Sequence, residues 1–347
     1  MFDKAAFAKH ESVHHFYDEK TGLRAIIAIH STALGPAGGG CRMWNYANSD
    51  EQFVDALRLS EGMSYKNAMA DLPLGGGKAV IWGNSKTDKT PEMFRALGRA
   101  IETLDGRYWS AEDVGVSVAD MAYAAEETKY VAGLSTGKAA SGDPSPVTAK
   151  GVFLGIKACA ERAFGSSDLN GKHIAVQGVG HVGAYLCDHL AKAGARLTIA
   201  DVNQDAVKSV AAATGAKTVH PDEIYDQPAD IFSPNALGAI VNPRTIDRIK
   251  AKVIAGGANN QLSTPEMGDK LRERGVLYAP DYVINGGGII NVAAEISGNY
   301  DPAWVEQKVQ QLGVTVGQVL DQAAREGRAT NRVSDDLARA RIAEKAR

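Results

Sequence analysis

The run from Gly178 to Gly183 (GVGHVG) constrains the fold of this chain more than any other stretch. It has the form G-x-G-x-x-G, directly follows the apolar run HIAVQ, and opens a helix-length segment that ends before Gly194. In such a strand-turn-helix unit the first glycine makes the tight turn, the second (Gly180) lets the backbone approach a pyrophosphate, and the third lets helix and strand pack closely. The helix N-terminus adds free N–H groups for the phosphates. The run therefore predicts a dinucleotide-binding α/β domain.

The residue that ends the next predicted strand, Asp201, indicates which dinucleotide binds. It lies roughly 20 residues beyond the first glycine, where an acidic side chain accepts hydrogen bonds from an adenosine ribose and repels a 2′-phosphate. NAD is therefore favoured over NADP. FAD shares the fingerprint, but the motif lies deep in the chain, which favours NAD. His181 and Val182 complete the cofactor-binding segment at variable positions, and we expect no chemical role for the His181 side chain. The alternative without a function is that these glycines are ordinary turn residues and that Asp201 is a surface charge.

The same half of the chain alternates short apolar runs with helix-length segments. The runs cover residues 173–179, 196–202, 229–232, 252–255 and 276–278, and segments such as 182–193 and 204–213 separate them. Strands that alternate with helices predict a doubly wound parallel sheet. Near the C-terminus, apolar residues recur every three or four positions from Val305 to Ala323, which predicts an amphipathic helix.

The N-terminal part mixes strands and helices. Residues 23–30 and 79–82 are short apolar runs that predict strands, and residues 53–63 follow a loose helical spacing. Thr90 as N-cap and Pro91 at the first helical position predict a further helix. This part of the chain is therefore also α/β.

Length and a change in composition divide the chain. Its 347 residues favour two domains at roughly 150 residues each. Between Ser135 and Pro146 the sequence STGKAASGDPSP has no apolar period, and we place a domain junction there. The predicted fold class is α/β, with an N-terminal domain of residues 1–140 and a doubly wound domain of residues 141–324.

Charge and cysteine content limit the partners and the location. The net charge is −3 and no long basic run occurs, so neither nucleic acid nor an anionic membrane is expected as a partner, and small molecules are favoured. Residues 1–19 contain no apolar core segment and no stretch has the length of a membrane span, so a cytoplasmic location is expected. Cys41, Cys159 and Cys187 fit neither a zinc pattern nor a disulfide framework, so we expect packed, reduced thiols and no metal site.

Two further glycine runs, GPAGGG ending at Gly40 and LGGGK ending at Lys78, hold seven of the 37 glycines of the chain. Successive glycines weaken helices and strands, so Gly75 to Gly77 predict a loop that needs a positive φ or a close approach by another group, such as a substrate. Lys78 lies beside glycines and apolar residues, and Lys66 lies near the end of the preceding helix. We expect one lysine to exchange protons with a reacting group and the other to hold a carboxylate.

Asp113, in the turn AEDVG, is the best acidic partner for these lysines. Its alternative role is that of a helix-capping aspartate, because residues 114–120 resemble the approach to a helix. The alternative for Lys66 and Lys78 is that both are solvated surface charges. Spacing alone leaves these readings open.

Several long motifs together resemble the Glu/Leu/Phe/Val dehydrogenases, and within them the leucine and phenylalanine dehydrogenases. In chain order they are GPAGGGCRM (35–43), GMSYKNAMADLPLGGGKAVI (62–81), AEDVG (111–115), GDPSPVTAKGV (142–152), VQGVGHVG (176–183), AGGANNQL (255–262) and YAPDYVINGGGIINV (278–292). The resemblance covers nearly the whole chain. It implies an N-terminal domain for substrate binding, catalysis and oligomerisation, a Rossmann-type NAD domain, a cleft between them, and a C-terminal helix at about 325–347 that rejoins the first domain. It also implies NAD-dependent, reversible oxidative deamination of an L-amino acid to a 2-oxo acid and ammonia.

The resemblance implies a role for individual residues. Lys66 would bind the substrate carboxylate, Lys78 would activate water, and Asp113 would handle the amine proton. Hydride would leave Cα for the nicotinamide, water would attack the imine, and the carbinolamine would collapse. Further implied substrate contacts are Gly38, Gly39, Gly40, Ala111, Ile289 and Val292. Implied cofactor contacts are Thr148, Asn235, Ala236, Asn259 and Asn285.

Some positions depart from the leucine dehydrogenase pattern. Gly38 stands where a leucine commonly lines the side-chain pocket, Asp143 replaces an asparagine, Asn235 a cysteine and Gly286 an alanine. Loss of a leucine side chain would enlarge the pocket, whereas the implied walls Ile289 and Val292 are bulky. No charged residue stands at these positions, which disfavours glutamate. We expect an apolar substrate, leucine or another branched-chain amino acid ahead of phenylalanine, with a phenylalanine or tryptophan dehydrogenase as the alternative.

Two other functions remain open at this point. The same fold could use Lys78 on a different substrate, as folate dehydrogenases with a catalytic lysine do. A protein that binds NAD without catalysis could act as a regulatory sensor. Intact Lys66, Lys78 and Asp113 disfavour the sensor. A homo-oligomer is expected, because the N-terminal domain of a two-domain enzyme is free to form a symmetric interface.

Overall fold

The computed structural model describes residues 4–134, 143–236, 238–298 and 300–346. The chain divides into two compact units. Unit 1 contains Met1–Asp143, Ile289–Trp304 and Ala338–Arg347, and unit 2 contains Pro144–Gly288 and Val305–Leu337. Residues 135–142, most of the predicted junction, lie outside the described residues.

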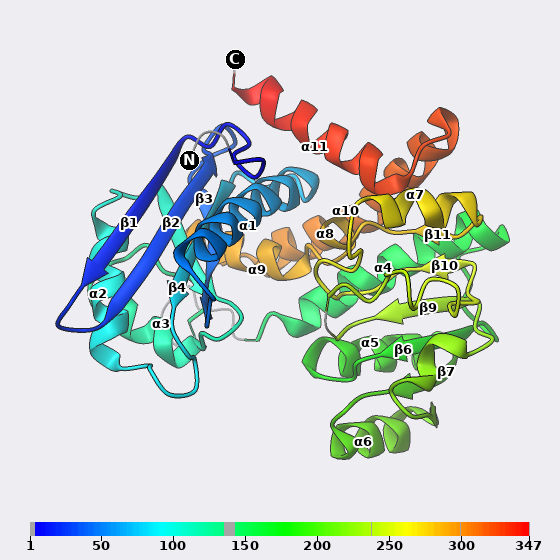
Figure 1. Cartoon of the computed structure of the whole chain (residues 1–347). Coiled ribbons are helices and arrows are strands. Elements are labelled where there is room, and N and C mark those ends of the chain that lie inside the picture. Colours follow the sequence, from blue (N-terminus) through cyan, green and yellow to red (C-terminus); the bar gives the residue numbers. More distant parts are fainter. Residues whose placement is uncertain (1–3, 135–142, 237, 299, 347) are drawn as a thin grey trace. The chain divides into compact units, whose positions relative to one another are not determined.

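Unit 1 is built on a five-stranded sheet in the order β1-β2-β4-β3-β5 (Figure 1). The strands are β1 (Ser12–Asp18), β2 (Leu23–Ser31), β3 (Ala37–Trp44), β4 (Gly75–Trp82) and β5 (Tyr108–Glu112). β2 pairs antiparallel with β1 and β4, whereas β3 runs parallel to β4 and β5. The predicted strands at 23–30 and 79–82 are present as β2 and the second half of β4.

Helices cover both faces of this sheet. The helices are α1 (Ser49–Met69), α2 (Pro91–Glu102) and α3 (Val118–Ala125). α1 packs Phe53 and Leu57 against Val80 and its neighbours on one face, while α2 packs Phe94 against Ile27 on the other. The predicted cap of α2 is confirmed, because the Met93 N–H donates to Oγ1 of Thr90 and Pro91 is the first helical residue.

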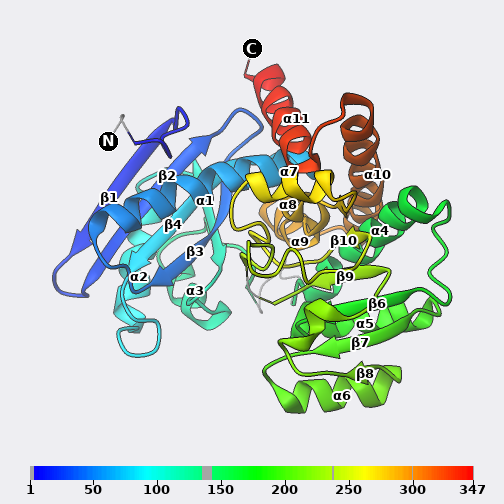
Figure 2. The same cartoon turned by 45° about the vertical axis from the view of Figure 1, so that its right-hand side comes forward.

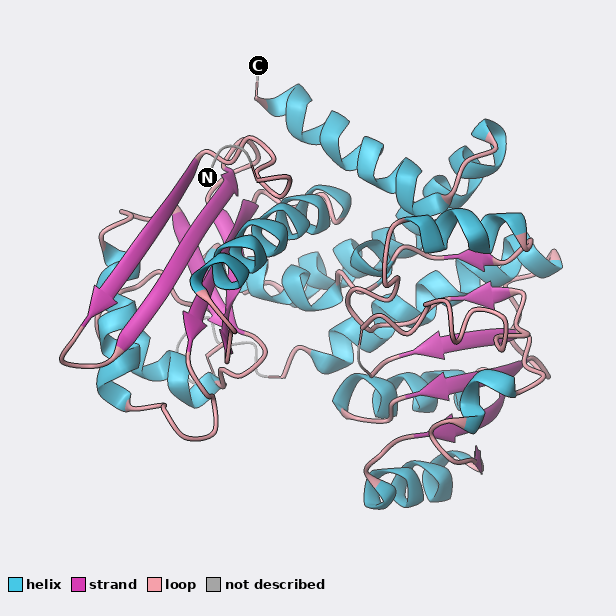
Figure 3. Cartoon of the chain, viewed as in Figure 1, coloured by secondary structure: helices cyan, strands magenta, loops and turns pink. Residues whose placement is uncertain are grey.

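Unit 2 contains a six-stranded sheet in which every pairing is parallel (Figure 3). Its strands are β6 (His173–Gln177), β7 (Arg196–Ala200), β8 (Lys217–Thr218), β9 (Ile231–Pro234), β10 (Val253–Ile254) and β11 (Leu277–Tyr278). Their order is β11-β10-β9-β6-β7-β8, so the chain builds outwards from β6 in one direction and from β9 in the other. In such sheets ligands bind at the carboxyl ends of the strands where the order reverses. The predicted doubly wound sheet is confirmed.

The helices of unit 2 follow the strands. They are α4 (Ser145–Phe164), α5 (His181–Lys192), α6 (Gln204–Thr214), the 3₁₀ turn η1 (Glu223–Asp226), α7 (Glu266–Glu273) and α8 (Asp281–Ile284). α4 packs against α5, and α5 against α6 (Figure 2). α5 and α6 begin and end within one residue of the predicted segments.

The last three helices contribute residues to both units. They are α9 (Gly287–Ile296), α10 (Pro302–Glu326) and α11 (Thr330–Lys345). The predicted amphipathic helix is α10, which buries Val305, Val309, Leu312 and Val316. No helix in the described part of the chain has the length and apolar character needed to cross a membrane. The three cysteines are free and buried, as expected.

The prediction that Gly75 to Gly77 form a loop is wrong, whereas Gly35, in the predicted Gly-Pro turn, lies outside the strands and has φ +141°. Gly38 to Gly40 lie inside β3, and Gly75 to Gly77 lie inside β4. None of the six has a positive φ. Close approach, the second predicted reason for these glycines, is confirmed, because a Cβ at Gly39 would collide with the carbonyl of Gly77 and a Cβ at Gly76 would collide with the backbone of Ser64 in α1. The runs allow the strands and α1 to pack without side chains between them.

Candidate functional site

Lys78 and Asp113 form an ion pair in unit 1. Lys78 is carried by β4 and is only 5% exposed, and its Nζ donates to Oδ2 of Asp113 at 2.5 Å. Asp113 follows β5 in a turn closed by the Val116 N–H, which donates to the Asp113 carbonyl. Burial opposes ionisation of the Asp113 carboxyl, but the charges of Lys78 and Arg42 outweigh burial and lower its pKa. Two groups suited to proton exchange are thus in contact, with the acid held ionised.

Asp113 does not cap the helix that follows it. The N-cap of α3 is Ser117, whose side chain accepts from the Asp120 N–H, while the Asp120 carboxylate accepts from the Ser117 N–H. The alternative role of Asp113 as a capping residue is therefore wrong. Lys78 is likewise no solvated surface charge, since it is buried and paired.

Arg42 is a second cation beside Asp113 that the sequence reasoning missed. Its Nε lies 3.6 Å from Oδ2 of Asp113, and its Nη1 donates to Asp55 of α1 at 3.1 Å. A signal was available, because Arg42 lies between Cys41 and Met43, which are both fully buried. Alternation along a strand then places an arginine on the opposite face of a glycine-rich strand.

Tyr108 links the two glycine-rich strands β3 and β4 through hydrogen bonds of its hydroxyl group. It is fully buried in β5, and its hydroxyl donates to the Gly39 carbonyl at 2.9 Å and accepts from the Ala79 N–H at 3.0 Å. Gly40 lies close to the acidic turn, because a Cβ there would be 2.9 Å from Cβ of Asp113. Glycine at position 40 is therefore what lets this turn approach β3.

The end of α1 is attached to the same strands. The side-chain amide of Asn67 donates to the Gly75 carbonyl at 2.5 Å and, more weakly, to the Gly38 carbonyl at 3.4 Å. Lys66 precedes it in the last turn of α1 and is half-buried. The structure thus places Lys66 at the helix end that is hydrogen-bonded to the strands of Gly38 and Lys78.

The implied pocket walls lie on α9 within unit 1. Ile289 and Val292 are half-buried and three residues apart, so they share a helix face with Glu295. The Glu295 carboxylate is buried and accepts from the Gly133 N–H at 2.5 Å. A Cβ at Gly133 would in turn contact Cβ of Ala111 at 3.7 Å. This contact brings the face of α9 to the end of β5, where Ala111 lies.

Gly38 is bordered by side chains. A Cβ at this position would lie 3.2 Å from Cδ1 of Leu74 and 3.7 Å from Nδ2 of Asn67. Leu74 is buried, so an alanine would press on it and a leucine would have to displace it or point elsewhere. The space beside Gly38 is therefore bounded by Leu74.

In unit 2 the glycine turn joins β6 to α5. Gly178 has φ +90°, and a Cβ there would lie 2.7 Å from the Ala236 nitrogen. A Cβ at Gly183 would collide with the Gly178 carbonyl. By contrast, no atom of the described residues other than its chain neighbours lies within 4 Å of the Cβ position of Gly180, and no side chain among them caps the N-terminus of α5 at His181. The first N–H groups of the helix are therefore not taken up by a side-chain cap from the described residues, which leaves them available to a pyrophosphate.

Asp201 lies at the carboxyl end of β7. Its Oδ2 accepts from the Val179 N–H at 2.8 Å, and its Oδ1 accepts from the Asn203 N–H at 2.9 Å. The carboxylate thus supports the glycine turn, a contact that the sequence did not predict. Each carboxylate oxygen can accept a second hydrogen bond, so contact with a ribose remains compatible with this geometry.

The implied asparagines of unit 2 form one connected group. Oδ1 of Asn235 accepts from the Gly257 N–H at 2.8 Å, and Nδ2 of Asn285 donates to the Gly257 carbonyl at 3.1 Å and to Oδ1 of Asn259 at 2.7 Å. Ala236 follows Asn235 and borders Gly178. On α4, Oγ1 of Thr148 donates to the Pro144 carbonyl, and Gly288 packs against it.

Oδ1 of Asn285 tests whether a nicotinamide fits here. It is buried and accepts no hydrogen bond from the described residues. A buried acceptor without a donor is costly unless a ligand satisfies it, and a carboxamide N–H would do so. Together with the open helix N-terminus at Gly180, this acceptor fits a nicotinamide dinucleotide. Within the described residues, no group of three His, Cys, Asp or Glu side chains is placed to hold a metal ion.

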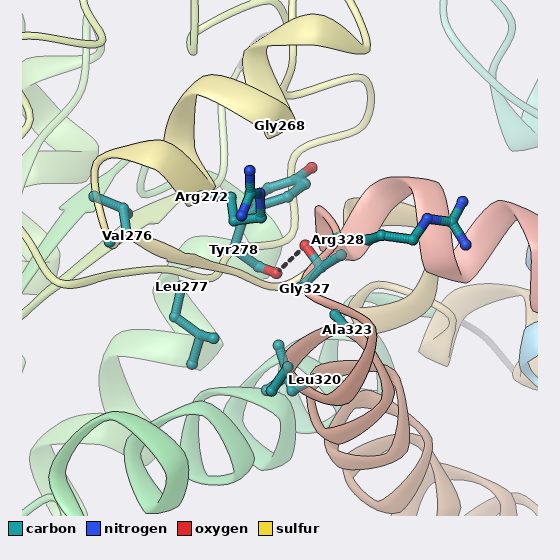
Figure 4. Close-up of a pocket in the computed structure, with 12 residues that line it drawn as sticks. Gly268, Arg272, Val276, Leu277, Tyr278, Leu320, Ala323, Gly327 and Arg328 are labelled. Atoms are coloured by element: carbon teal, nitrogen blue, oxygen red, sulfur yellow. Dashed lines mark hydrogen bonds between the residues drawn. The ribbon is translucent and has the colours of Figure 1, made fainter.

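A separate cavity of about 330 Å³ lies in unit 2 between α7, β11, α10 and the start of α11 (Figure 4). Leu277, Leu320 and Ala323 contribute apolar surface, and Arg272 lies at its edge. Oγ1 of Thr330 donates to the Tyr278 carbonyl at 2.7 Å beside it. None of the predicted site residues lines this cavity.

Two family profiles match the chain. The profile described as Glu/Leu/Phe/Val dehydrogenase, dimerisation domain, matches residues 10–130. The profile described as Glutamate/Leucine/Phenylalanine/Valine dehydrogenase matches residues 197–330. Together they cover most of both units.

Individual relatives match over nearly their full length. The leucine dehydrogenase of Bacillus subtilis is 53% identical over 325 residues, which are 94% of this chain and 89% of that protein. The phenylalanine dehydrogenase of Bacillus thermotolerans is 44% identical over 350 residues, 98% of this chain and 91% of that protein. The crystal structure of L-tryptophan dehydrogenase from Nostoc punctiforme superposes with a TM-score of 0.86 at 42% identity and covers 97% of each chain.

Proposed function

The chain belongs to the Glu/Leu/Phe/Val dehydrogenase family and is an amino-acid dehydrogenase, and from this premise we propose that it oxidatively deaminates a branched-chain L-amino acid with NAD. The amino acid, NAD⁺ and water give the 2-oxo acid, ammonium, NADH and a proton, and the reaction is reversible. The observation that carries the proposal is the buried Lys78–Asp113 pair, which joins a proton donor and acceptor beside the glycine strands.

The proposed roles follow from the position of each side chain. Lys66, at the end of α1, would hold the substrate carboxylate through its ammonium group. Asp113 would take a proton from the substrate amino group and return one to the leaving nitrogen. Lys78 would accept a proton from the water that attacks the imine carbon. Ala111 and the α9 residues Ile289 and Val292 would contact the apolar side chain of the substrate.

The proposed cofactor is NAD, bound by unit 2. The bound dinucleotide would supply the hydride acceptor. The glycine turn and the N-terminus of α5, from Gly178 to Gly183, would hold the pyrophosphate. Asp201 would accept from the ribose and disfavour a 2′-phosphate, and Asn285 would accept from the carboxamide.

The substrate is proposed to be leucine or a similar branched-chain amino acid. The relatives at 51–53% identity are leucine dehydrogenases, whereas the phenylalanine dehydrogenases are at 44%. Leu74 beside Gly38 supports this choice, because it occupies part of the room that the missing leucine side chain would otherwise leave for an aromatic ring.

The assembly and location belong to the same proposal. Residues 10–130 match a profile described as a dimerisation domain, which supports a homo-oligomer built through unit 1. The free, buried thiols of Cys41, Cys159 and Cys187 support a reducing, cytoplasmic location.

The test is an initial-rate screen that measures NADH absorbance with leucine, isoleucine, valine, phenylalanine, tryptophan and glutamate. We expect the highest kcat/KM with a branched-chain amino acid and none with glutamate, and much less activity with NADP than with NAD. A preference for phenylalanine or tryptophan would overturn the substrate assignment. No NADH with any amino acid, together with tight NAD binding by calorimetry, would support a sensor instead.

A further inference from the structure

Arg42 has a feature that the Lys78–Asp113 pair does not explain. Its Nε is buried and donates no hydrogen bond to any described residue. Oδ2 of Asp113, its ion-pair partner, lies 3.6 Å away, just beyond hydrogen-bond distance. A buried guanidinium N–H without an acceptor is destabilising, so its presence here calls for an explanation.

The rest of the Arg42 side chain is held in place from α1. Nη1 donates to both carboxylate oxygens of Asp55, at 3.1 and 3.5 Å, and the hydroxyl of buried Tyr46 donates to the same carboxylate at 2.7 Å. Burial and the Asp55 carboxylate raise the pKa of Tyr46 far above its usual range, so its hydroxyl stays a donor. Asp55 and Tyr46 thus anchor one side of the guanidinium while Nε remains beside Asp113.

Few other charges face Asp113. Lys78 approaches from β4, Arg42 and Cys41 belong to β3, and Tyr108 belongs to β5. Burial raises the pKa of Cys41 to about 12 and that of Tyr108 well above its usual range, so both are neutral at working pH. The ion-pair partners of Asp113 among the described residues are therefore Lys78 and Arg42. If Lys78 becomes neutral, Arg42 is the cation that remains.

We propose that Arg42 is a positioning residue whose Nε takes up the Asp113 carboxylate whenever Lys78 gives up its proton. A side-chain movement of less than about 1 Å would close the 3.6 Å gap to a normal charge-assisted hydrogen bond. Asp113 then keeps its charge and its position while Lys78 is neutral, and the positive charge of Arg42 favours the neutral amine. The inference rests on the proposed function of Lys78 and requires no bound cofactor.

Two readouts on Arg42→Gln and Arg42→Lys test the proposal. The first is the pH profile of kcat/KM for oxidative deamination. The second is competitive acetylation of the enzyme without NAD, quantified on the Lys78 peptide by mass spectrometry, since acetic anhydride reacts only with the neutral amine. Arg42→Gln is expected to move both midpoints about one pH unit upwards, because it removes a cation beside the pair. Arg42→Lys keeps the positive charge, so both midpoints should lie close to those of the parent enzyme, while kcat stays reduced.

A control and a variant of opposite sign complete the test. Arg95 in α2 is also held by two carboxylates, Glu92 and Glu126, and Arg95→Gln should leave both midpoints unchanged. Asp55→Asn removes the anion that neutralises Arg42, so both midpoints should move downwards, and this variant decides the matter if Arg42→Gln does not fold. A loss of kcat in Arg42→Gln with unmoved midpoints, or an upward shift in Asp55→Asn, would overturn the proposal. If the protein deaminated no amino acid, the proposed function would fail, but the acetylation midpoints of Lys78 would still test the effect of Arg42.

Discussion

The two candidate sites of this protein differ in the groups that they offer to a ligand: charged side chains in unit 1 and backbone N–H groups in unit 2. In unit 1 the proposed chemistry depends on charged side chains in contact, since Lys78 and Arg42 both form ion pairs with Asp113. In unit 2 the turn at Gly178 to Gly183 offers backbone N–H groups that no described side chain caps, and two of its glycines, Gly178 and Gly183, leave no room for a Cβ. The first site depends on the side chains of its residues, and the second depends on the absence of a side chain at its glycines.

This difference predicts how each site fails. Removing a side chain from the ion-paired site leaves a buried charge without its partner, which damages chemistry. The three glycines of the turn have no side chain to remove, so only added atoms can disturb these positions. Truncation should therefore affect turnover in unit 1, and enlargement should affect cofactor affinity in unit 2.

The largest effect is expected for Lys78→Ala. Without the amine, water at the imine carbon has no proton acceptor, so kcat should fall about 10³-fold while NAD affinity is unchanged. Steady-state NADH formation measures the first quantity and calorimetric titration with NAD the second. Lys89→Ala is a matched control, because Lys89 forms an equally short ion pair with Asp120 in the same unit and should keep kcat within about twofold. Near-normal turnover in Lys78→Ala would contradict the assignment of its role.

A smaller effect is expected for Gly180→Val. Its φ is not positive and its Cβ position is open, so the fold should accept the side chain. The added atoms would occupy the space of the pyrophosphate, and the KM for NAD should rise at least about tenfold, or roughly 1.4 kcal/mol. The kcat at saturating NAD should remain close to that of the parent. If the melting temperature fell as far as in Gly183→Ala, whose Cβ meets the Gly178 carbonyl, the open-space interpretation would be wrong.

The smallest effect concerns the stability of unit 1 against pH. His10 and His30 lie in edge-to-face contact beneath α1, and burial lowers the pKa of both. Below about pH 6.5 the unfolded chain binds protons that the folded chain does not, so stability should fall as the pH drops from 7.5 to 5.5. Urea unfolding at several pH values measures this slope, and the double variant His10→Gln, His30→Gln should flatten it. An unchanged slope in the double variant would show that other groups cause the dependence.

Local signals were sufficient for much of the fold. Thr90 and Pro91 mark the start of α2, and the apolar run before Gly178 marks β6, because caps and strand patterns involve residues close in sequence. β3 and β4 were harder to predict from the sequence, because runs of glycine are typical of loops. Glycine is needed there because α1 and Tyr108 approach the strands, and such long-range contacts leave no local pattern.

For the candidate site, too, residue types could be read from the sequence, whereas the contacts between them could not. Lys78 and Asp113 were identified from residue type and neighbouring glycines, but their 2.5 Å contact joins β4 to the turn after β5. The role of Arg42 required its distance to Asp113, and the role of Glu295 required its bond to Gly133 from the far end of the chain.

The sequence alone determined the doubly wound unit, the glycine turn and the family, and it pointed to the residues that we propose exchange protons. These follow from periodicity, motif order and side-chain chemistry, which are written in the order of the residues. Only the tertiary structure decided that the glycine runs are strands, that Leu74 bounds the space at Gly38, and that Asp113 stands between two cations. Those facts depend on which distant segments pack together, because the energy of a buried charge is set by its neighbours in space.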